Sequence, residues 1–352
     1  MSKSERVVKI GVVGCGAIGQ RRHIPEVAAN PRARLVALCD VVASRAEEQA
    51  KKYGGQAYAD FDEFLKHPDM DAVIIGTPNY LHAPMTLAAF KAGKHVLVEK
   101  PMATTRKEAK AMIEAARKAG KFLMIGQNQR LMRPHVKARE ILSTGRLGKV
   151  LTFRTAFKHA GPEFWSVDNH PGTWFFQKEK AAMGVCGDLG IHKADLMRYL
   201  LGEEIVEVAA MIGTQNKRYA NGKLIDVDDN AMLLVKTQSG VMGSIIISWT
   251  NYGEPEANYT VIYCERAVMM LATDPDYGVI VRWRNGDEDK HKVGEIATNV
   301  KQVSSGVADM FIDGILAGKE PPINGMEGYR SLNVILTAFE ACAAGRTLPV
   351  PK

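Results

Sequence analysis

The chain has 352 residues, of which 46% are hydrophobic and 24% charged. That length suits about two globular domains, and the composition is too balanced for a disordered chain. The longest apolar runs, such as residues 72–76, are far shorter than the ~20 residues that span a bilayer. The formal charge is +7, but basic and acidic residues are interspersed and no nucleic-acid-binding motif accompanies them. We therefore expect neither a nucleic-acid nor a membrane partner, and attribute the charge to a site for an anionic cofactor.

The five cysteines lie far apart and show no CxxC spacing. This pattern favours neither a disulfide framework nor a zinc site. No apolar segment of the signal-peptide type follows the polar residues 1–6. We expect a cytoplasmic protein without a bound metal.

Residues 7–128 alternate short apolar strands with amphipathic helices. The predicted strands cover residues 8–13, 35–39, 72–75, 95–98 and 122–125, and the predicted helices cover 18–30, 44–53, 85–92 and 106–119. Val8–Val13 is almost continuously apolar, as a strand buried on both faces should be. Strands alternating with helices of this length predict a parallel sheet with helices on both faces.

A glycine-rich segment, Gly14–Gly19, follows the first predicted strand and has the pattern GxGxxG. In a dinucleotide site the first glycine allows a tight turn, the second admits the pyrophosphate, and the third lets helix and strand pack closely. The amino terminus of the next helix offers free N–H groups to the phosphates. We therefore assign Gly14, Gly16, Ala17 and Ile18 to cofactor binding. The alternative is a glycine-rich turn without a ligand.

An acidic residue should end the second strand of such a site, and Asp40 lies there, 21 residues beyond Gly19. A carboxylate at this position accepts hydrogen bonds from the adenosine ribose and repels a 2′-phosphate, which favours NAD over NADP. Arg45 is a further cofactor candidate. It could pair with a 2′-phosphate, cover the adenine, or pair with Glu48.

Beyond about residue 150 the pattern changes to strands in close succession. The predicted strands cover residues 150–157, 206–213, 231–237, 241–249, 259–264 and 278–283, and helices are predicted over 188–201, 307–317 and 328–344. Residues 130–149 predict a helix with a solvated basic face. We expect an α/β protein with two domains: a Rossmann domain over residues 1–128, and an α+β substrate domain with a mostly antiparallel sheet over 129–352. The last helices could pack back on the first domain.

Three further segments carry a resemblance. They are Gly76-Thr77-Pro78-Asn79-Tyr80-Leu81-His82, Glu99-Lys100-Pro101, and Gly187-Asp188-Leu189-Gly190-Ile191-His192-Lys193-Ala194-Asp195. Together they resemble the glucose–fructose oxidoreductase/inositol dehydrogenase (Gfo/Idh/MocA) family, along almost the whole chain. The resemblance implies a Rossmann domain and an α+β domain whose open sheet serves as a subunit interface. It therefore implies a homo-oligomer, a dimer or a tetramer.

The resemblance also implies roles for individual residues. Lys100, Asp188 and His192 would surround the reacting hydroxyl. The cofactor would be met by Thr77, Asn79 and His82 beside its nicotinamide half, with Glu99, Lys100 and Gln127 as further contacts. Two positions depart from the family pattern, Ala182-Met183-Gly184 and Phe175. Both lie where substrate is expected, so the substrate of known members cannot be carried over.

The residue types agree with oxidation of an alcohol. Asp188, His192 and Asp195 have the spacing i, i+4, i+7, which predicts one helix face. Histidine titrates near neutrality and suits proton removal, and a neighbouring carboxylate stabilises its charged form. An ammonium such as that of Lys100 hydrogen-bonds an oxygen that gains negative charge. As alternatives, the three residues could bind a divalent metal, His192 could be a core histidine, and Lys100 could pair with Glu99 at the surface.

The expected substrate contacts offer many donors, few acceptors and one flat apolar face. They are Lys100, Arg130, Lys158, His159, Trp174, Asp188 and His192. This inventory suits a ring with several hydroxyl groups, although Arg130, His159 and Trp174 could equally be structural. The function we expect is therefore NAD-dependent oxidation of a ring hydroxyl of an inositol, monosaccharide or glycoside. The alternatives are an NAD-using glycosidase and a non-enzymatic cofactor-sensing regulator.

Overall fold

The structure is a computed structural model that describes residues 6–167, 172–252, 257–296 and 304–352. The chain divides into two compact units. Unit 1 comprises Met1–Asn128 and Thr298–Tyr329, and unit 2 comprises Gln129–Ala297 and Arg330–Lys352. Over the described ranges, no helix combines the length and apolar character that crossing a membrane requires.

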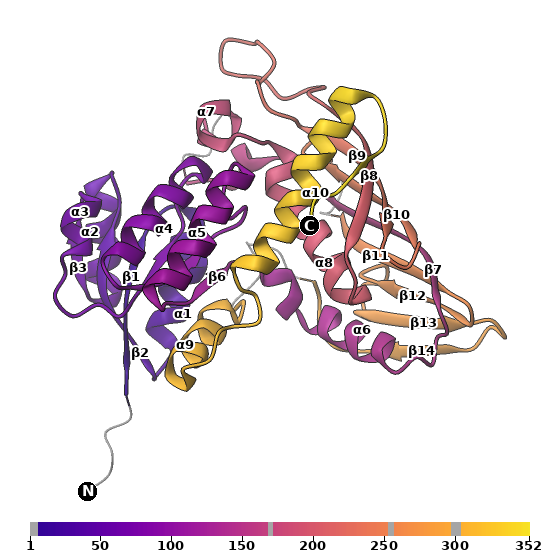
Figure 1. Cartoon of the computed structure of the whole chain (residues 1–352), viewed down its shortest axis with the longest axis horizontal. Helices are drawn as coiled ribbons and strands as arrows, with labels where there is room; N and C mark the ends of the chain where they lie inside the picture. The colour runs from indigo at the N-terminus through magenta and orange to yellow at the C-terminus, as the bar shows by residue number, and fades with distance from the viewer. Residues whose placement is uncertain (1–5, 168–171, 253–256, 297–303) are drawn as a thin grey trace, which may run out of the picture. The chain divides into compact units, whose positions relative to one another are not determined.

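Unit 1 is built on a parallel six-stranded sheet with the order β3-β2-β1-β4-β5-β6 (Figure 1). Its strands are β1 (Val8–Val13), β2 (Ala33–Cys39), β3 (Gln56–Tyr58), β4 (Ala72–Ile75), β5 (His95–Val98) and β6 (Leu123–Ile125). Every residue of β4 is buried, because central strands of a parallel sheet are covered on both faces. The strand order reverses between β1 and β4, and ligands bind open α/β sheets outside the carboxyl ends of the strands at such a point.

The helical segments of the first part of unit 1 connect these strands. They are the π-helical turn η1 (Gly19–His23), α1 (Ile24–Ala29), α2 (Ala43–Tyr53), α3 (Phe61–Leu65), the short 3₁₀ turn η2 (Asn79–Leu81), α4 (His82–Lys91) and α5 (Arg106–Ala119). Local sequence sets the ends of α5. The Thr105 hydroxyl accepts the N–H of Glu108 while the Glu108 carboxylate accepts that of Thr105, and Gly120 ends the helix in a left-handed conformation.

A carboxylate on α1 fixes the segment that returns to unit 1 late in the chain. The buried Glu26 accepts hydrogen bonds from the N–H and hydroxyl of Ser305 and from the N–H of Ala308, the first of these at 2.5 Å. Ala308 lies in the first turn of α9 (Val307–Ala317). A negative charge is favourable at this end of a helix because the N–H groups there have no partner within the helix.

Unit 2 contains a nine-stranded sheet with the order β14-β13-β12-β11-β7-β10-β9-β8-β15. Only the pairing of β7 with β10 is parallel among the pairings described. The strands are β7 (Val150–Lys158), β8 (Ile205–Gly213), β9 (Asn230–Thr237), β10 (Met242–Ser248), β11 (Ala257–Cys264), β12 (Ala267–Leu271), β13 (Val279–Trp283), β14 (Glu288–His291) and β15 (Leu348–Pro349).

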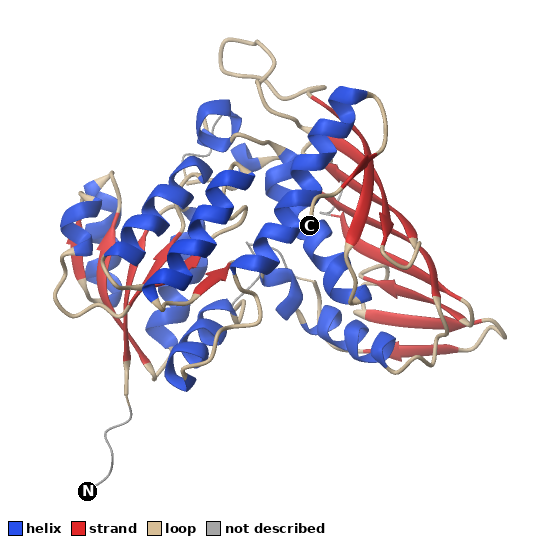
Figure 2. Cartoon of the chain, in the orientation of Figure 1, coloured by secondary structure: helices blue, strands red, loops and turns tan. Residues whose placement is uncertain are grey.

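Helices cover one face of this sheet (Figure 2). The helical segments are the turn η3 (Asn128–Leu131), α6 (Arg133–Ser143), the turns η4 (Pro162–Phe164) and η5 (Trp174–Phe176), α7 (Lys178–Ala181), the π-helical turn η6 (Cys186–Gly190), α8 (Ile191–Leu201) and α10 (Gly325–Ala344). Along β9, buried and exposed residues alternate, so one face forms the core. A Cβ at Gly190 would lie 2.7 Å from Ile247 of β10 and 3.2 Å from Ile335 of α10. Turn η6 therefore lies between the covered face and α10.

The structure confirms the predicted fold class and nearly all predicted strands, with β1, β4 and β5 matching residue for residue. The sequence prediction omitted β3, α3, α7, β12, β14 and β15. Strand β14 has the sequence Glu-Asp-Lys-His and lies at the sheet edge, so it needs no apolar alternation. The predicted basic helix is shorter than expected, and its solvated face does not include Arg130, which is buried before α6 begins.

Candidate functional site

The glycine loop of unit 1 leaves space above its second glycine. Gly14 has a φ of +95°, and a Cβ there would lie 2.4 Å from the carbonyl oxygen of Gly76. A Cβ at Gly19 would lie 2.1 Å from the carbonyl oxygen of Gly14, so both positions require glycine. At Gly16, by contrast, no described atom lies within 4 Å of such a Cβ. This opening, at the start of η1, suits the close approach of a pyrophosphate.

Asp40 holds the glycine loop from the end of β2. Its Oδ2 accepts the N–H of Cys15 at 2.8 Å, and its Oδ1 accepts that of Val42 at 2.9 Å. The carboxylate therefore has a structural task besides the expected contact with a ribose, a task that the sequence pattern did not reveal. Arg45 lies in the first turn of α2, close enough to influence the Cys15 thiol.

The thiols beside this loop are unreactive. Burial, with a smaller contribution from the negative charge of Asp40, raises the pKa of Cys15 and that of Cys39 to about 12. Both thiols stay protonated at neutral pH, so neither supplies a thiolate nucleophile or metal ligand.

The segment after β4 is tied to the segment after β5 through His82. Its Nδ1 lies 2.7 Å from the carbonyl oxygen of Pro101, and its Nε2 lies 2.9 Å from that of Thr77. Burial lowers the pKa of this imidazole. Because backbone carbonyls occupy both ring nitrogens, the geometry supports a positioning role for His82. Thr77 is half-buried and Asn79 is buried in the same segment.

Glu99 and His23 form a buried pair immediately before Lys100. His23 Nε2 lies 2.8 Å from Glu99 Oε1, Arg22 Nη1 lies 3.7 Å from the same oxygen, and the N–H of Lys100 donates to Glu99 Oε2 at 3.2 Å. Burial alone would raise the pKa of Glu99, but the His23 hydrogen bond and the charges of His23 and Arg22 bring it well below its usual value. His23 had no recognisable signal in the sequence, because it meets Glu99 only through the fold.

Gln127 provides a second sign of an absent ligand. It follows β6, it is 1% exposed, and both polar atoms of its amide lack a hydrogen-bond partner among the described residues. Native proteins rarely leave such groups unsatisfied, since each costs about 1–3 kcal/mol. Together with the space at Gly16, this orphaned amide shows that the carboxyl edge of the unit 1 sheet fits a polar cofactor such as NAD.

In unit 2, the central feature is the carboxylate of Asp188 on η6. It is 7% exposed, and its Oδ2 accepts the indole N–H of Trp249 at 3.1 Å. The Nε2 of His159 lies 3.6 Å from the same oxygen. His192 follows in the first turn of α8, also 7% exposed, with its ring centroid 6.1 Å from that of Phe157. Trp249 comes directly after β10 and was not among the expected site residues.

The contacts of His159 indicate which of its two ring nitrogens carries the proton in the neutral ring. The N–H of Gly161 donates to Nδ1 of His159 at 3.0 Å, so this nitrogen carries the lone pair. The proton of the neutral ring must then be on Nε2, the nitrogen that faces Asp188. His159 therefore turns an N–H group toward the Asp188 carboxylate, with 3.6 Å between Nε2 and Oδ2.

Aromatic side chains extend from this carboxylate. Trp165 lies 6.4 Å from His159 and 5.0 Å from Phe175, and Trp174 stacks on Phe175 at 3.8 Å between ring centroids. Phe175 meets Trp249 edge-on at 6.5 Å. Three of the four tryptophans of the chain thus belong to one cluster, which we call the aromatic cluster: Trp165, Trp174, Phe175 and Trp249. The concentration of tryptophan between residues 165 and 174 was the available sequence signal.

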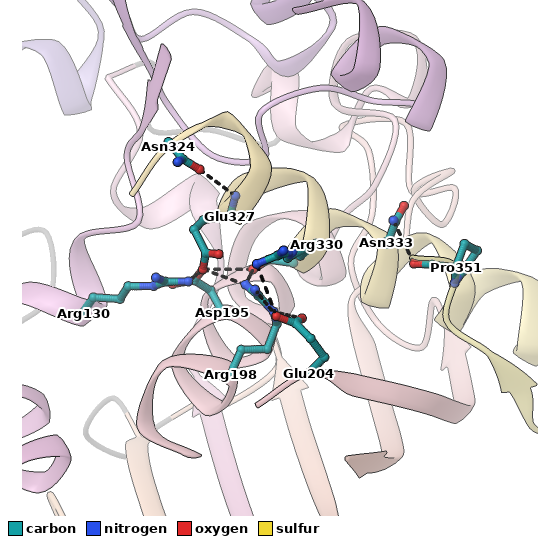
Figure 3. Close-up of polar contacts among 10 residues, drawn as sticks. Arg130, Asp195, Arg198, Glu204, Asn324, Glu327, Arg330, Asn333 and Pro351 are labelled. Carbon is teal, nitrogen blue, oxygen red and sulfur yellow. Dashed lines mark hydrogen bonds and ion pairs between the residues drawn. The ribbon is translucent and has the colours of Figure 1, made fainter. Parts of the chain in front are cut away.

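Asp195 has a different partner from the one its spacing predicted. Nε and Nη2 of Arg130 each donate to it at 2.7 Å, and the Ser331 hydroxyl donates at 2.9 Å (Figure 3). Arg198 lies 3.8 Å from Asp195 and pairs with Glu204 at 2.6 Å. The π-helical turn at Asp188 also breaks the regular helical spacing. The Asp195 carboxylate is therefore engaged by Arg130 and Ser331, and no metal-binding group of His, Cys, Asp or Glu occurs within the described residues.

The other expected substrate contacts differ in position. Arg130 has its guanidinium on Asp195, which supports a positioning role. Lys158 follows Phe157 on β7, so the two side chains point to opposite faces of the sheet. The Phe157 ring lies beside His192, so the side chain of Lys158 points away from His192, and the geometry does not support its expected contact with substrate there. Trp174 and His159 do belong to the group around Asp188.

Two family models match the chain. The model described as an oxidoreductase family with an NAD-binding Rossmann fold matches residues 8–127. The GFO/IDH/MocA C-terminal domain matches residues 135–270. Among curated proteins, levoglucosan dehydrogenase of Pseudarthrobacter phenanthrenivorans is 31% identical over 264 residues, which are 68% of this chain and 66% of that protein. Myo-inositol 2-dehydrogenase of Thermotoga maritima is 28% identical over 92% of this chain and 93% of its own length.

Solved structures are similar over nearly the entire chain. Aldose-aldose oxidoreductase from Caulobacter crescentus, complexed with glycerol, has a TM-score of 0.83 and 29% identity over 98% of this chain and all of its own. Levoglucosan dehydrogenase in complex with NADH and L-sorbose has a TM-score of 0.88 and 25% identity over 99% of this chain and all of its own. The chain therefore belongs to the Gfo/Idh/MocA family of oxidoreductases, and its first unit is an NAD-binding Rossmann domain.

Proposed function

We propose that this protein oxidises a ring hydroxyl of a cyclic polyol or sugar by hydride transfer to NAD. The observation that carries the proposal is the buried carboxylate of Asp188, which faces two N–H donors and is bordered by the aromatic cluster. Carboxylates and N–H donors recognise hydroxyl groups, and aromatic faces pack against the C–H face of a sugar ring. Curated relatives named for levoglucosan and myo-inositol support the same substrate class.

We assign the proton transfer to His192. Oxidation of an alcohol requires removal of the hydroxyl proton, and an imidazole suits this task near neutral pH. The Asp188 carboxylate lies beside Trp249 and His159, and we assign it the stabilisation of positive charge when the imidazole of His192 is protonated. The ammonium of Lys100 hydrogen-bonds the substrate oxygen as that oxygen gains negative charge.

The nucleotide would be held by residues of unit 1. Gly16, Ala17 and Ile18 offer backbone N–H groups and space to the pyrophosphate, Gly14 makes the turn that exposes them, and Asp40 offers its carboxylate to the ribose. Gln127 satisfies its amide on the bound molecule. When bound, NAD supplies the hydride acceptor, and the protein supplies orientation and proton transfer. A protein with this cofactor and five free thiols suits a reducing, cytoplasmic compartment.

The face of the unit 2 sheet opposite its helices supports self-association. Met211, Met232, Leu234 and Met242 on β8, β9 and β10 are each more than 60% exposed. The strand register places Met211 and Ile246 on either side of Met232. A contiguous apolar face of this kind marks an interaction surface, and we propose that a second copy of the chain covers it.

The first prediction concerns the substrate. A panel of myo-inositol, D-glucose, methyl β-D-glucoside, levoglucosan, ethanol and lactate should be assayed with NAD by NADH absorbance. We expect one cyclic compound to exceed ethanol and lactate in kcat/KM by at least about 10³-fold, because an aliphatic alcohol leaves several polar groups of the site unpaired at about 1–3 kcal/mol each. Higher turnover of ethanol or lactate contradicts the substrate class. Cleavage of an aryl glycoside without net NADH indicates an NAD-using glycosidase instead.

The second prediction concerns the choice of cofactor. Because the Asp40 carboxylate repels a 2′-phosphate, kcat/KM with NAD should exceed that with NADP by at least about tenfold, equivalent to about 1.4 kcal/mol. Asp40→Asn removes the charge but keeps an oxygen for the N–H of Cys15, so it should narrow the ratio with a small loss of stability. Asp40→Ser should narrow the ratio and also lower the melting temperature. Preference of the wild-type enzyme for NADP would contradict the assignment and favour Arg45 as a phosphate ligand.

The third prediction concerns catalysis. His192→Asn and Lys100→Met should each lower kcat by about 10²–10⁴-fold, as the loss of general acid–base groups does. The matched control is His135→Asn. His135 is a buried histidine of unit 2 whose pKa is lowered to about 3 by burial and by Lys193, so it stays neutral and takes no part in proton transfer. Steady-state kinetics and NADH fluorescence titration would separate turnover from cofactor binding. Near-normal turnover of either site variant refutes its role.

The fourth prediction concerns assembly. Size-exclusion chromatography with light scattering should give the mass of a dimer or tetramer for the wild-type protein. The double variant Met232→Lys, Leu234→Lys should dissociate it, because lysines at the centre of an apolar interface leave buried charges unpaired. Val41→Lys, at a position 85% exposed on unit 1, is the control and should keep the wild-type mass. A monomeric wild-type protein, or an unchanged mass for the double variant, rules out this interface.

A further inference from the structure

A buried aspartate just before β9 holds the beginning of the segment that carries Asp188. Asp228 is 6% exposed. Its Oδ1 accepts the N–H of Gly184 at 2.7 Å, and its Oδ2 accepts the N–H of Cys186 at the same distance. Its backbone carbonyl accepts the N–H of Val185, the residue between them, at 2.8 Å. One residue therefore satisfies three successive backbone N–H groups.

These N–H groups need an outside partner because they begin a helical segment. The first N–H groups of a helix have no acceptor within it, and an N-cap side chain usually supplies one. Turn η6 begins after Val185, whose apolar side chain makes no capping hydrogen bond. Asp228, more than 40 residues further along the chain, takes the place of that cap. Its negative charge also suits the positive end of the helix dipole.

The backbone at Gly184 lies very close to the backbone at Asp228. A Cβ at Gly184 would lie only 1.9 Å from the carbonyl oxygen of Asp228. Any larger residue at position 184 must move the turn away from Asp228. The segment Ala182-Met183-Gly184 departs from the family pattern, but it has a glycine at the position that contacts Asp228.

The turn positions the carboxylate of Asp188. The N–H of Asp188 donates to the carbonyl of Gly184 at 3.0 Å. The backbone of Asp188 is therefore hydrogen-bonded to Gly184, which is itself hydrogen-bonded to Asp228. From the other side, Trp249 donates its indole N–H to Asp188 and its backbone N–H to the carbonyl of Asp229 at 2.8 Å. Asp228 therefore supports this segment through its side chain, whereas Asp229 supports Trp249 only through its backbone carbonyl, which a substitution of the Asp229 side chain leaves in place.

We propose that Asp228 is a positioning residue for alcohol oxidation. Its hydrogen bonds hold the Gly184–Cys186 turn in place, and the turn determines the positions of Asp188 and His192 relative to the substrate. The proposal rests on the roles given above to Asp188 and His192. Its physical basis is that misplacing a reacting group by about 1 Å can cost about 10²-fold in rate. Asp228 itself touches no substrate.

Asp229 provides a matched control. It is fully buried, and its carboxylate accepts the N–H groups of Gln215, Asn216 and Lys217 at 2.7–2.8 Å. It is thus as buried as its neighbour, and its carboxylate accepts three backbone hydrogen bonds where that of Asp228 accepts two, but its side chain holds another loop. Loss of either carboxylate should destabilise unit 2, whereas only the loss at position 228 releases the turn before Asp188.

The test compares Asp228→Asn with Asp229→Asn. Each variant keeps one acceptor oxygen and loses the other. With the best substrate of the panel described above, we expect Asp228→Asn to lower kcat by about 10–100-fold and to leave the KM for NAD and the Kd for NADH within about twofold. Asp229→Asn should keep kcat within about threefold of wild type at a similar loss of melting temperature.

Hydrogen exchange measured by mass spectrometry tests the hydrogen bonds between Asp228 and the Gly184–Cys186 turn, independently of any reaction. Asp228→Asn should speed exchange in the peptide that contains residues 184–188, and Asp229→Asn should speed it around residues 215–217. Gly184→Ala, which keeps the carboxylate but forces the turn away, should reproduce the loss of kcat and the faster exchange. Unchanged exchange at 184–188 in Asp228→Asn, or equal losses of kcat in the two aspartate variants, overturns the proposal. If Asp228→Asn speeds hydrogen exchange at residues 184–188 but His192→Asn keeps normal turnover, the proposed function is wrong, while the role of Asp228 in holding the turn is retained.

Discussion

The hydrogen bond from a backbone N–H to a buried carboxylate is the interaction on which this structure depends. Asp40 accepts the N–H groups of Cys15 and Val42 at the glycine loop. Glu26 accepts that of Ala308 at the start of α9, and Asp228 accepts those of Gly184 and Cys186 at η6. Each carboxylate joins segments that are distant in sequence, and each does so where N–H groups lack a partner of their own. Charge-assisted bonds of this kind are short and directional.

Hydrogen bonds offset part of the cost of burying these carboxylates, and at Asp228 burial still raises the pKa above its ordinary value. An unpaired charge in the core would be expensive, but each of these oxygens faces one or more N–H groups. The same compensation explains Asp188, whose Oδ2 faces the N–H of Trp249 and of His159. These contacts fix the direction of the Asp188 carboxylate, and a site that handles protons requires such preorganised groups.

Aromatic and histidine side chains complete the site of unit 2 by restricting its orientations. Gly161 fixes the tautomer of His159, Phe157 lies beside the rings of both His159 and His192, and Phe175 and Phe176 lie beside Trp249. The Asp195–Arg130 pair holds α8 from beneath, with Ser331 of α10 as a third member. These residues supply preorganisation: few side chains around Asp188 can rotate without losing a hydrogen bond or a stacking contact.

The sequence by itself determined the fold class, most of the strands and the nature of the cofactor. Period, apolar runs and glycine spacing are local signals, and the strands of a parallel sheet are continuous enough to be recognised without their neighbours. Asp40 and the Gly14–Gly19 loop could be identified because their positions relative to one strand–helix unit are nearly invariant in dinucleotide sites. The segment around Asp188 and His192 could be identified for a similar reason, as a compact motif.

Only the tertiary structure decided which side chains meet. Regular helical spacing predicted that Asp195 would share a helix face with Asp188 and His192, but only the fold shows that its carboxylate pairs with Arg130 and Ser331. Arg130, expected on a solvated helix face, is buried, and Lys158 points to the opposite side of its strand from Phe157. His23, Trp249 and Asp228 gave no local signal, because each acts on a residue that lies more than 40 positions away in the chain. Contacts over such separations depend on how the elements pack, and packing is a property of the folded chain rather than of any one segment.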